Sequence, residues 1–259
     1  MTVIMNVRDG IADIQLARPD KRNAMTRQMY RRLGESFISV RDDPHVRVAL
    51  IRGSTPDAFC AGADLEDVAP DLIDGHHDVS AWDDAHLKHV DLFKPVIAAV
   101  DGYCLGGGFE ILLATDIRIA ARTAQFGLPE PKVGMVPAGG SLAKLVRQIP
   151  YAHAMNLLLT GRRIDAAEAL SIGLVSEVVE PSDLLPTARD MAAALTRLSQ
   201  RSLEVIKEAV LRLSDLPQSA ALHAEALYGQ KAFTSPEAAE GVAAFRQGRA
   251  PRFPGTEEG

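Results

Sequence analysis

The sequence predicts an α/β core followed by a region made only of helices. Apolar runs typical of strands alternate with helical patterns up to about residue 180, which is the pattern of α/β proteins. From about residue 182 onward the pattern is helical throughout. With 259 residues, the chain has room for one large domain or for a core with an appendage. We therefore predict a core over residues 1–181, which carries the site, and a helical region over residues 182–259.

The first predicted elements are a hairpin and a helix. Residues 3–16 alternate between apolar and polar side chains on either side of Asp9-Gly10, a dipeptide that favours a tight hairpin turn. A helix is expected from Thr26 to about Arg41, because apolar side chains recur there at helical spacing.

Four later apolar runs predict buried strands, because each is short and bounded by polar or turn-forming residues. They cover residues 46–52, 96–100, 116–121 and 174–179. Ser141 opens a predicted helix. Asp165 and Glu168 form a capping-box pattern for another helix, which Gly173 ends.

Residues 66–90 have weak periodicity and are rich in aspartate and histidine. One interpretation is a mobile, solvated segment with a helical end. The other is a segment that contacts the substrate and selects among substrates, and Trp82 is then the first residue to test. No ligand spacing among these side chains supports a metal site, so we predict none.

Composition and charge argue against several functions. The formal net charge is −6 and aromatic residues make up 5% of the chain, so no nucleic-acid partner is expected. No apolar run is long enough to span a bilayer, and residues 1–9 lack the segments of a signal peptide, so we expect a cytoplasmic protein without a membrane partner. Cys60 and Cys104 stand among small apolar residues and are expected to be buried thiols.

Three consecutive glycines, Gly106 to Gly108, stand between the predicted strand at 96–100 and apolar residues 111–114, which predict a buried helix. Glycine lets the backbone adopt unusual torsions and lets another molecule approach closely. The N–H groups that begin a helix can hold an oxygen that becomes negative during a reaction. Glu110 follows within one helical turn, so an acid or base would stand beside such a site. The alternative is a turn that serves packing alone; the spacing fits neither a P-loop nor a dinucleotide fingerprint.

A second carboxylate also has two interpretations. Glu130 lies between Pro129 and Pro131, which fix the backbone and are expected to exclude a helix there. Glu130 is therefore either presented rigidly for catalysis or exposed on a turn.

A polar loop at residues 18–25 carries a cationic edge formed by Arg18, Lys21 and Arg22. The loop is either a solvated connection or a place where cations meet phosphates.

Four stretches, taken together and in this order, resemble the crotonase family, also called the enoyl-CoA hydratase/isomerase family. They are Arg18-Pro19-Asp20-Lys21-Arg22-Asn23-Ala24, Phe59-Cys60-Ala61-Gly62-Ala63-Asp64-Leu65, Gly102-Tyr103-Cys104-Leu105-Gly106-Gly107-Gly108-Phe109-Glu110 and Phe126-Gly127-Leu128-Pro129-Glu130. Residues 240–245 also resemble the family's C-terminal helix, so the resemblance extends over roughly residues 3–253.

The resemblance implies a spiral of repeated ββα units and a C-terminal helical region that mediates trimerisation, with two trimers often pairing into a hexamer. It implies a coenzyme A thioester as the substrate and no separate cofactor. The thioester oxygen would accept hydrogen bonds from two backbone N–H groups, which match Ala63 and Gly107 in this sequence. The residues expected against the coenzyme are Lys21, Arg22, Ala24, Ala61, Asp64, Leu65 and Glu66.

The resemblance also assigns acid–base chemistry to Glu110 and Glu130. Adding water to a 2-enoyl thioester needs a base for the water that attacks C3 and an acid that protonates C2. We assign the water to Glu110 and the proton at C2 to Glu130. Members that only move a double bond generally keep one acidic residue at such positions, so the pair favours an enoyl-CoA hydratase.

Other reactions of this family remain as alternatives: enoyl-CoA isomerisation, or dehydration of a carnitinyl or crotonobetainyl thioester, which residues 129–137 also resemble. A non-catalytic acyl-CoA-binding protein is a further alternative. The sequence departs from typical hydratases at Gly139-Gly140, a pair displaced by one position, and at Lys144, where they have arginine. In the family these residues lie near the acyl pocket, so the acyl preference is not predicted.

Overall fold

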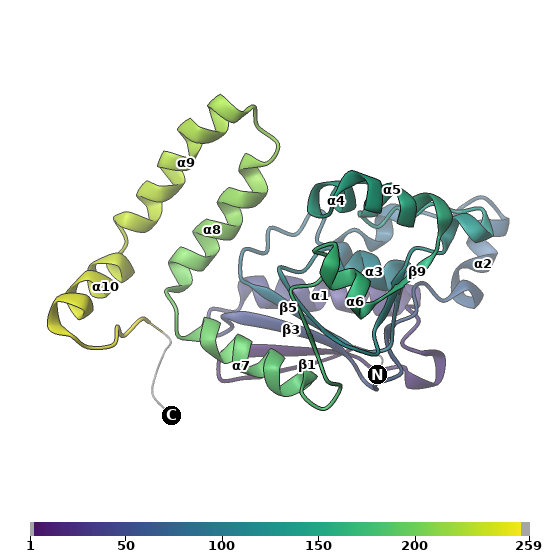
Figure 1. Cartoon of the computed structure of the whole chain (residues 1–259), viewed down its shortest axis with the longest axis horizontal. Helices are drawn as coiled ribbons and strands as arrows, with labels where there is room; N and C mark the ends of the chain where they lie inside the picture. The colour runs from purple at the N-terminus through teal and green to yellow at the C-terminus, as the bar shows by residue number, and fades with distance from the viewer. Residues whose placement is uncertain (1–2, 255–259) are drawn as a thin grey trace.

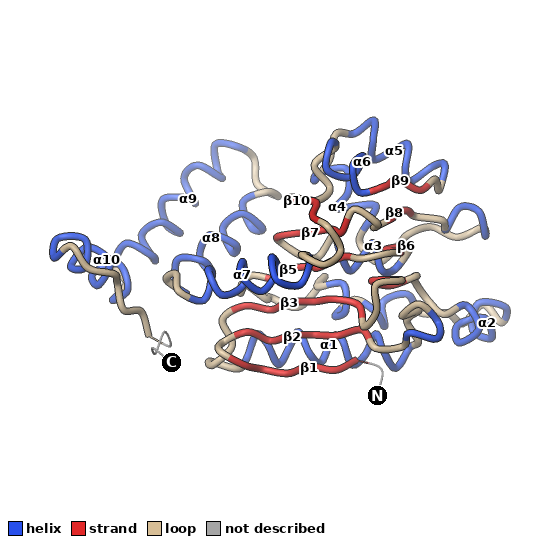
Figure 2. Tube along the Cα trace, turned by 60° about the horizontal axis from the view of Figure 1, so that its bottom comes forward, coloured by secondary structure: helices blue, strands red, loops and turns tan. Residues whose placement is uncertain are grey.

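The large sheet has six strands in the order β1-β2-β3-β5-β7-β10. In this computed structural model, which describes residues 3–254, they span Val3–Arg8, Ile11–Leu16, Val48–Gly53, Val96–Val100, Ile117–Ala121 and Glu177–Val179. β1 and β2 form the predicted hairpin, and all later neighbours are parallel (Figure 2). At the hairpin turn Asp9 has φ 52° and Gly10 has φ 74°, the left-handed pair that such a turn requires. The predicted strands are thus confirmed, although the last one is shorter than expected.

A second, smaller sheet has the order β4-β6-β8-β9. Its strands span Ala58–Cys60, Tyr103–Leu105, Gln125–Gly127 and Arg163–Asp165. Three times the chain runs from a strand of the large sheet to a strand of the small sheet and then to a helix: β3-β4-α2, β5-β6-α3 and β7-β8-α4. This repetition is the ββα spiral that the resemblance implied.

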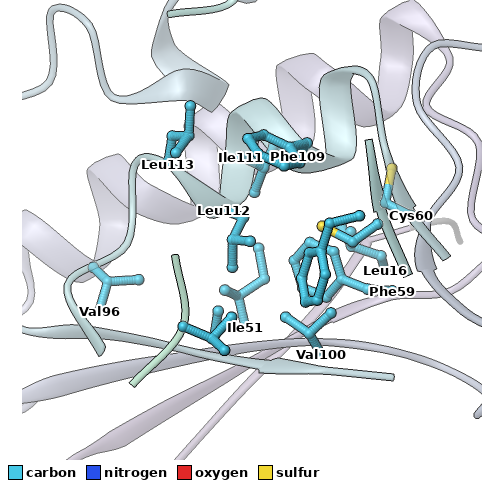
Figure 3. Packing of buried hydrophobic residues seen from close by; sticks show 14 of the residues in the cluster. Leu16, Ile51, Phe59, Cys60, Val96, Val100, Phe109, Ile111, Leu112 and Leu113 are labelled. Atoms are coloured by element: carbon cyan, nitrogen blue, oxygen red, sulfur yellow. The ribbon is translucent and has the colours of Figure 1, made fainter. Parts of the chain in front are cut away.

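Helices pack on both faces of the large sheet, as a mainly parallel sheet requires. α1 (Arg27–Asp42) and the wholly buried α3 (Gly107–Leu112) cover one face, where Phe59, Phe109 and Leu112 join the main core (Figure 3). α7 (Leu184–Thr196) covers the other face and buries Ala188 and Ala192 against it. Cys60 and Cys104 are confirmed as buried thiols, paired in register across β4 and β6.

The helix ends follow local signals in the sequence. Thr26 caps α1 by accepting a hydrogen bond from the Met29 N–H, and Asp165 caps α6 (Ala166–Ser171) in the same way from Glu168. The other helices of the core are α2 (Leu65–Ile73), α4 (Ser141–Gln148) and α5 (Tyr151–Thr160).

Three C-terminal helices extend away from the core (Figure 1). They are α8 (Gln200–Leu213), α9 (Gln218–Phe233) and α10 (Pro236–Gln247). α7, the first helix of the predicted helical region, instead packs on the core sheet. The predicted boundary between the core and the helical region, at residues 181 and 182, stays a prediction. Residues 1–2 of the predicted core and residues 255–259 of the predicted helical region lie outside the described residues. No helix within residues 3–254 has both the length and the apolar character needed to cross a membrane.

Candidate active site

Two backbone N–H groups meet where β6 turns into α3. Gly106 has φ 51° and Gly62 has φ 103°, so both turns adopt the left-handed backbone that glycine permits. These turns bring the loop after β4 against the start of α3: a β-carbon at Gly107 would lie 3.7 Å from the Ala63 nitrogen. Within residues 3–254, neither the Ala63 nor the Gly107 N–H has a hydrogen-bond acceptor. The predicted pair of donors is therefore brought together and left free.

Glu110 is buried in the first turn of α3, with 5% of its surface exposed. One carboxylate oxygen accepts a hydrogen bond from the Ser141 N–H at 3.2 Å, at the start of α4. The other oxygen, Oε2, occupies the space that a side chain at position 139 would need. A β-carbon added to Gly139 would lie only 2.5 Å from it. Burial raises the pKa of Glu110, while hydrogen bonds from Ser141 and Gly139 oppose that rise.

Glu130 opens a short 3₁₀ helix, Glu130–Val133. The expectation that the prolines exclude any helix here is wrong, because Pro131 is the second residue of the 3₁₀ helix and no N–H is needed in its first turn. The side chain is half-buried and not an exposed turn charge: Oε1 lies 2.8 Å from the place of a β-carbon at Gly106, and Oε2 has no partner among the described residues. Burial and the nearby Glu110 carboxylate raise the pKa of Glu130 to about 7.

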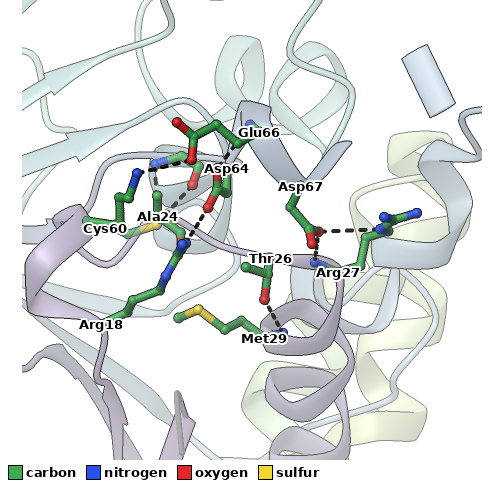
Figure 4. A network of polar contacts seen from close by, with 11 residues as sticks. Arg18, Ala24, Thr26, Arg27, Met29, Cys60, Asp64, Glu66 and Asp67 are labelled. Atoms are coloured by element: carbon green, nitrogen blue, oxygen red, sulfur yellow. Dashed lines mark hydrogen bonds and ion pairs between the residues drawn. The ribbon is translucent and has the colours of Figure 1, made fainter. Parts of the chain in front are cut away.

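The loops at residues 18–25 and 61–66 are joined both by backbone hydrogen bonds and by side-chain contacts such as the Arg18–Asp64 ion pair (Figure 4). Ala61 N–H donates to the Arg22 carbonyl at 3.0 Å, and the Met25 and Gly62 backbones pair at 2.8 Å. Arg18 also donates to the Ala24 carbonyl at 3.0 Å. The residues predicted to lie against the coenzyme thus stand on two joined loops next to Ala63.

Arg18 and Lys21 of the first loop form separate ion pairs with residues of the second loop. Arg18 does not face outward with the other cations; its guanidinium lies 2.5 Å from the Asp64 carboxylate, which is 7% exposed and also caps α2. The Asp64 side chain therefore links Arg18 to the start of α2, and the Asp64 backbone is itself hydrogen-bonded to Met25, Asp67 and Val68. Lys21 pairs at 3.1 Å with Glu66, and both are solvent-accessible.

Two further residues predicted to lie against the coenzyme, Leu65 and Arg22, are exposed on these loops. Leu65, the first residue of α2, is 47% exposed. Arg22 has φ 50°, and its guanidinium lies 5.0 Å from the centre of the Tyr103 ring.

Sequence reasoning missed two polar residues that line the same site, Tyr30 and His86. Tyr30 is 1% exposed and stacks on Trp82 with ring centres 4.5 Å apart. His86 is fully buried, and a β-carbon at Gly139 would lie 2.7 Å from its ring and 2.5 Å from Glu110. The helical spacing of Tyr30 to Leu33 could have shown that Tyr30 faces the core.

The interpretation of residues 66–90 as a solvated segment agrees with the exposure of Ile73 and Val79 but is wrong for the end of the segment, where Ala85 and His86 are buried. α2 forms at the start of the segment, and two 3₁₀ turns follow at Val79–Trp82 and Asp84–His86. Ala85 is 1% exposed, and the second turn packs against α1. Trp82 is thereby held beside the site.

Lys144 reaches the same region from α4. Its Nζ donates to the His86 carbonyl at 2.8 Å, and burial lowers the pKa of this amine to about 8. The lysine that departs from the typical hydratase pattern therefore supports the turn that carries His86.

The site thus combines two backbone N–H groups that have no acceptor within residues 3–254 with one buried and one half-buried carboxylate. Comparison with known proteins points to the same family as the sequence motifs. The chain matches the enoyl-CoA hydratase/isomerase family model over residues 6–256. It is 38% identical to an (E)-benzylidenesuccinyl-CoA hydratase of Thauera aromatica, over 98% of this chain and 100% of that protein. It is 37% identical to a carnitinyl-CoA dehydratase of Proteus mirabilis, over 97% of both chains.

Solved structures agree as well. The crystal structure of an enoyl-CoA hydratase from Mycobacterium tuberculosis superposes with a TM-score of 0.89 at 33% identity, over 98% of this chain and 99% of that one. Family model, sequence identity and fold thus coincide over nearly the whole length of the chain. This protein belongs to the enoyl-CoA hydratase/isomerase family.

Proposed function

We propose that the protein is an enoyl-CoA hydratase, which adds water reversibly to a 2-enoyl-CoA thioester. The observation that carries the proposal is the meeting of the buried Glu110 and the half-buried Glu130 with the N–H groups of Ala63 and Gly107, which have no acceptor within residues 3–254. Two donors and two proton carriers are what hydration of a conjugated thioester needs.

The reaction places negative charge on the thioester oxygen. When water attacks C3, electrons move through the conjugated system to give an enolate. The Ala63 and Gly107 N–H groups would stabilise that charge without reorganisation, because the fold already holds them in place.

The two carboxylates differ in a way that suits opposite roles. Burial raises the pKa of Glu110, but the hydrogen bonds from Ser141 and Gly139 oppose that rise and stabilise the ionised form, which suits a base for water. Glu130 has an oxygen without a partner among residues 3–254 and a pKa raised to about 7, which suits an acid that protonates C2 at neutral pH. The addition leaves Glu110 protonated and Glu130 ionised, so transfer of one proton from Glu110 back to Glu130 would restore the starting state.

Coenzyme A would lie along the joined loops at residues 18–25 and 61–66. Their backbone groups would bind adenine and pantetheine, while Lys21 and Arg22 lie at the accessible edge where phosphates would be expected. Since the coenzyme is part of the substrate, the reaction as proposed uses no separate cofactor.

Dehydration of a hydroxyacyl thioester is the second candidate, because it is the same reaction in reverse. The 37% identity to a carnitinyl-CoA dehydratase favours keeping it beside hydration. Isomerisation of a double bond, or acyl-CoA binding without chemistry, makes less use of two carboxylates.

Self-association into a trimer or a dimer of trimers is proposed from the C-terminal helices. Their exposed apolar side chains include Ile206 at 60%, Val210 at 65% and Phe233 at 83%. Apolar surface of this kind is usually covered by another chain. A monomer at micromolar concentration in sedimentation would contradict the proposal. The cytoplasmic location stays a prediction.

The decisive experiment incubates the purified protein with separate 2-enoyl-, 3-enoyl- and 3-hydroxyacyl-CoA thioesters and identifies the products by mass spectrometry. A hydratase gains the mass of water on a 2-enoyl substrate and approaches the same equilibrium from the 3-hydroxyacyl side. Conversion of 3-enoyl to 2-enoyl substrate without a mass change would instead identify an isomerase. No turnover of any thioester, with binding retained, would reject an enzymatic role.

A further inference from the structure

The Tyr30 hydroxyl is a buried polar group that the reaction scheme above does not use. Tyr30 lies near the start of α1, is 1% exposed, and its hydroxyl has no hydrogen-bond partner within residues 3–254. Buried hydroxyl groups in proteins are nearly always paired. An unpaired one that faces an active site therefore points to a bond completed by the substrate.

The position of this hydroxyl is beside both backbone donors. A β-carbon added at Gly107 would collide with the Tyr30 oxygen, and the same β-carbon would lie 3.7 Å from the Ala63 nitrogen. The glycine at position 107 is thus what makes room for the hydroxyl. The hydroxyl and the Ala63 nitrogen therefore both lie close to one point, the place of a β-carbon on Gly107.

The surroundings hold the Tyr30 ring in one place. Trp82 stacks on one face, with an interplanar angle of 11°, and His86 lies at a tilt with ring centres 5.5 Å apart. Thr26 caps the helix one turn earlier. A donor fixed in this way needs no rearrangement when charge develops, which is the condition for effective stabilisation of a transition state.

The hydroxyl is also kept as a donor. Burial, followed by the charges of Cys60, Glu110 and Glu130, raises the pKa of Tyr30 well above its ordinary value. The neutral phenol carries a proton that it can share with a negative oxygen.

We propose that the Tyr30 hydroxyl donates a third hydrogen bond to the thioester oxygen, beside the N–H groups of Ala63 and Gly107. Tyr30 is then a catalytic residue that stabilises the enolate. The inference rests on the proposed function, because it is that reaction which places negative charge on this oxygen.

The test compares the wild-type protein with Tyr30→Phe, which keeps the ring and its stacking but removes the hydroxyl. Tyr151→Phe is the matched control, because Tyr151 is 67% exposed on α5 and outside the site. Steady-state hydration of a 2-enoyl-CoA gives kcat and KM. Titration with acetoacetyl-CoA, followed by the ultraviolet absorption of its enolate, and with saturated butyryl-CoA gives affinities for a charged and an uncharged thioester oxygen.

Tyr30→Phe is expected to lower kcat by about a hundredfold with little change in KM, since removal of one oxyanion donor typically costs about a hundredfold or more. Affinity for the acetoacetyl-CoA enolate should fall by a similar factor, while affinity for butyryl-CoA and all properties of Tyr151→Phe stay unchanged.

Two results would overturn the inference: wild-type kcat and enolate affinity in Tyr30→Phe, or an equal loss of affinity for both thioesters, which would indicate a packing role. If the wild-type protein itself neither hydrates the enoyl substrate nor binds the enolate, the proposed function fails first and this inference falls with it. Normal wild-type activity with an unaffected Tyr30→Phe rejects the inference alone.

Discussion

The two sides of the candidate site are built in different ways. On the coenzyme side, residues 18–25 and 61–66, backbone hydrogen bonds join the loops and ion pairs engage Arg18 and Lys21. The reaction side is defined here as Tyr30, His86, Glu110, Glu130 and Ser141. Each of these residues except Glu110 has a buried polar side-chain atom without a hydrogen-bond partner among the described residues.

This difference has a physical meaning. A paired backbone surface is stable without ligand and suits the part of the substrate that never changes. Unpaired buried groups destabilise the free protein, and they are consistent with a site where the substrate supplies the missing bonds. The contrast predicts that changes on the reaction side act on turnover, while changes on the coenzyme side act on binding of every substrate alike.

The largest effect is expected where the two sides meet, at the Ala63 N–H. Ala63→Pro removes this donor and should reduce hydration to near the background rate. Ala63→Gly keeps the N–H and serves as the control. Rates are measured on variants whose folding and assembly are first checked by circular dichroism and sedimentation. A folded Ala63→Pro protein with substantial activity would show that this N–H is not the donor.

The next largest effect is expected from the carboxylates. Glu110→Gln and Glu130→Gln keep the shape of the side chain but remove its acid–base capacity, so each should lower kcat by about a hundredfold or more. Binding of a saturated acyl-CoA should survive. Glu35→Gln, on the exposed face of α1, is the control. Near-normal hydration by either site variant would remove that glutamate from the mechanism.

The raised pKa of Glu130 predicts a pH-dependent gain in stability for Glu130→Gln. The folded protein binds this proton more tightly than the unfolded chain does, so the wild type loses stability as pH rises from about 4.5 to about 7. Thermal unfolding should therefore show Glu130→Gln to be more stable than wild type by about 1–2 kcal/mol at pH 8, allowing for solvent screening.

That difference should disappear below about pH 4.5, where the wild-type carboxyl is protonated in both the folded and the unfolded state. Glu35→Gln should show no such trend. A difference that stays constant with pH would mean that burial of the charge is not its cause.

A smaller effect, confined to substrate choice, is expected at Trp82. Trp82→Leu changes the wall beside Tyr30 and should alter the ranking of kcat/KM among acyl chains by several-fold, because pocket contacts act on each acyl group differently. Free coenzyme A should bind as before. Ile73→Ala, 83% exposed in the same segment, is the control. Equal losses for all acyl chains would indicate that the segment supports the fold and does not select substrates.

The smallest effect is expected on the coenzyme side, at Lys21. Lys21→Met should raise KM for every acyl-CoA by about the same few-fold factor and leave kcat unchanged, because an accessible cation contributes little to binding. The effect should shrink at high salt, as the charges are screened. Arg8→Met, on the exposed hairpin, is the control. If Lys21→Met instead changed the ranking of kcat/KM among acyl chains, the coenzyme side would also select substrates, and the proposed difference between the two sides would be wrong.

Much of the fold could be predicted from short stretches of sequence. The hairpin depends on Asp9-Gly10, the start of α1 on Thr26, and the large sheet on apolar runs of five or six residues, apart from its shorter last strand. Each signal lies within one element, where backbone torsions and side-chain spacing alone determine the outcome. The motif around Glu110, together with its three companions, was sufficient to identify the family.

The tertiary structure alone decided what lies next to what. β4, β6 and β8 have three residues each, too few to show an alternating pattern. Arg18 pairs with Asp64, 46 residues away, and not with solvent. Tyr30, Trp82 and His86 come from separate turns of the chain, and their meeting beside Gly107 depends on how the spiral closes. Local sequence determined each element and the chemical groups available. Contacts between distant segments arise only when those segments pack together, and the same packing excludes the water whose loss raises the pKa of Glu130.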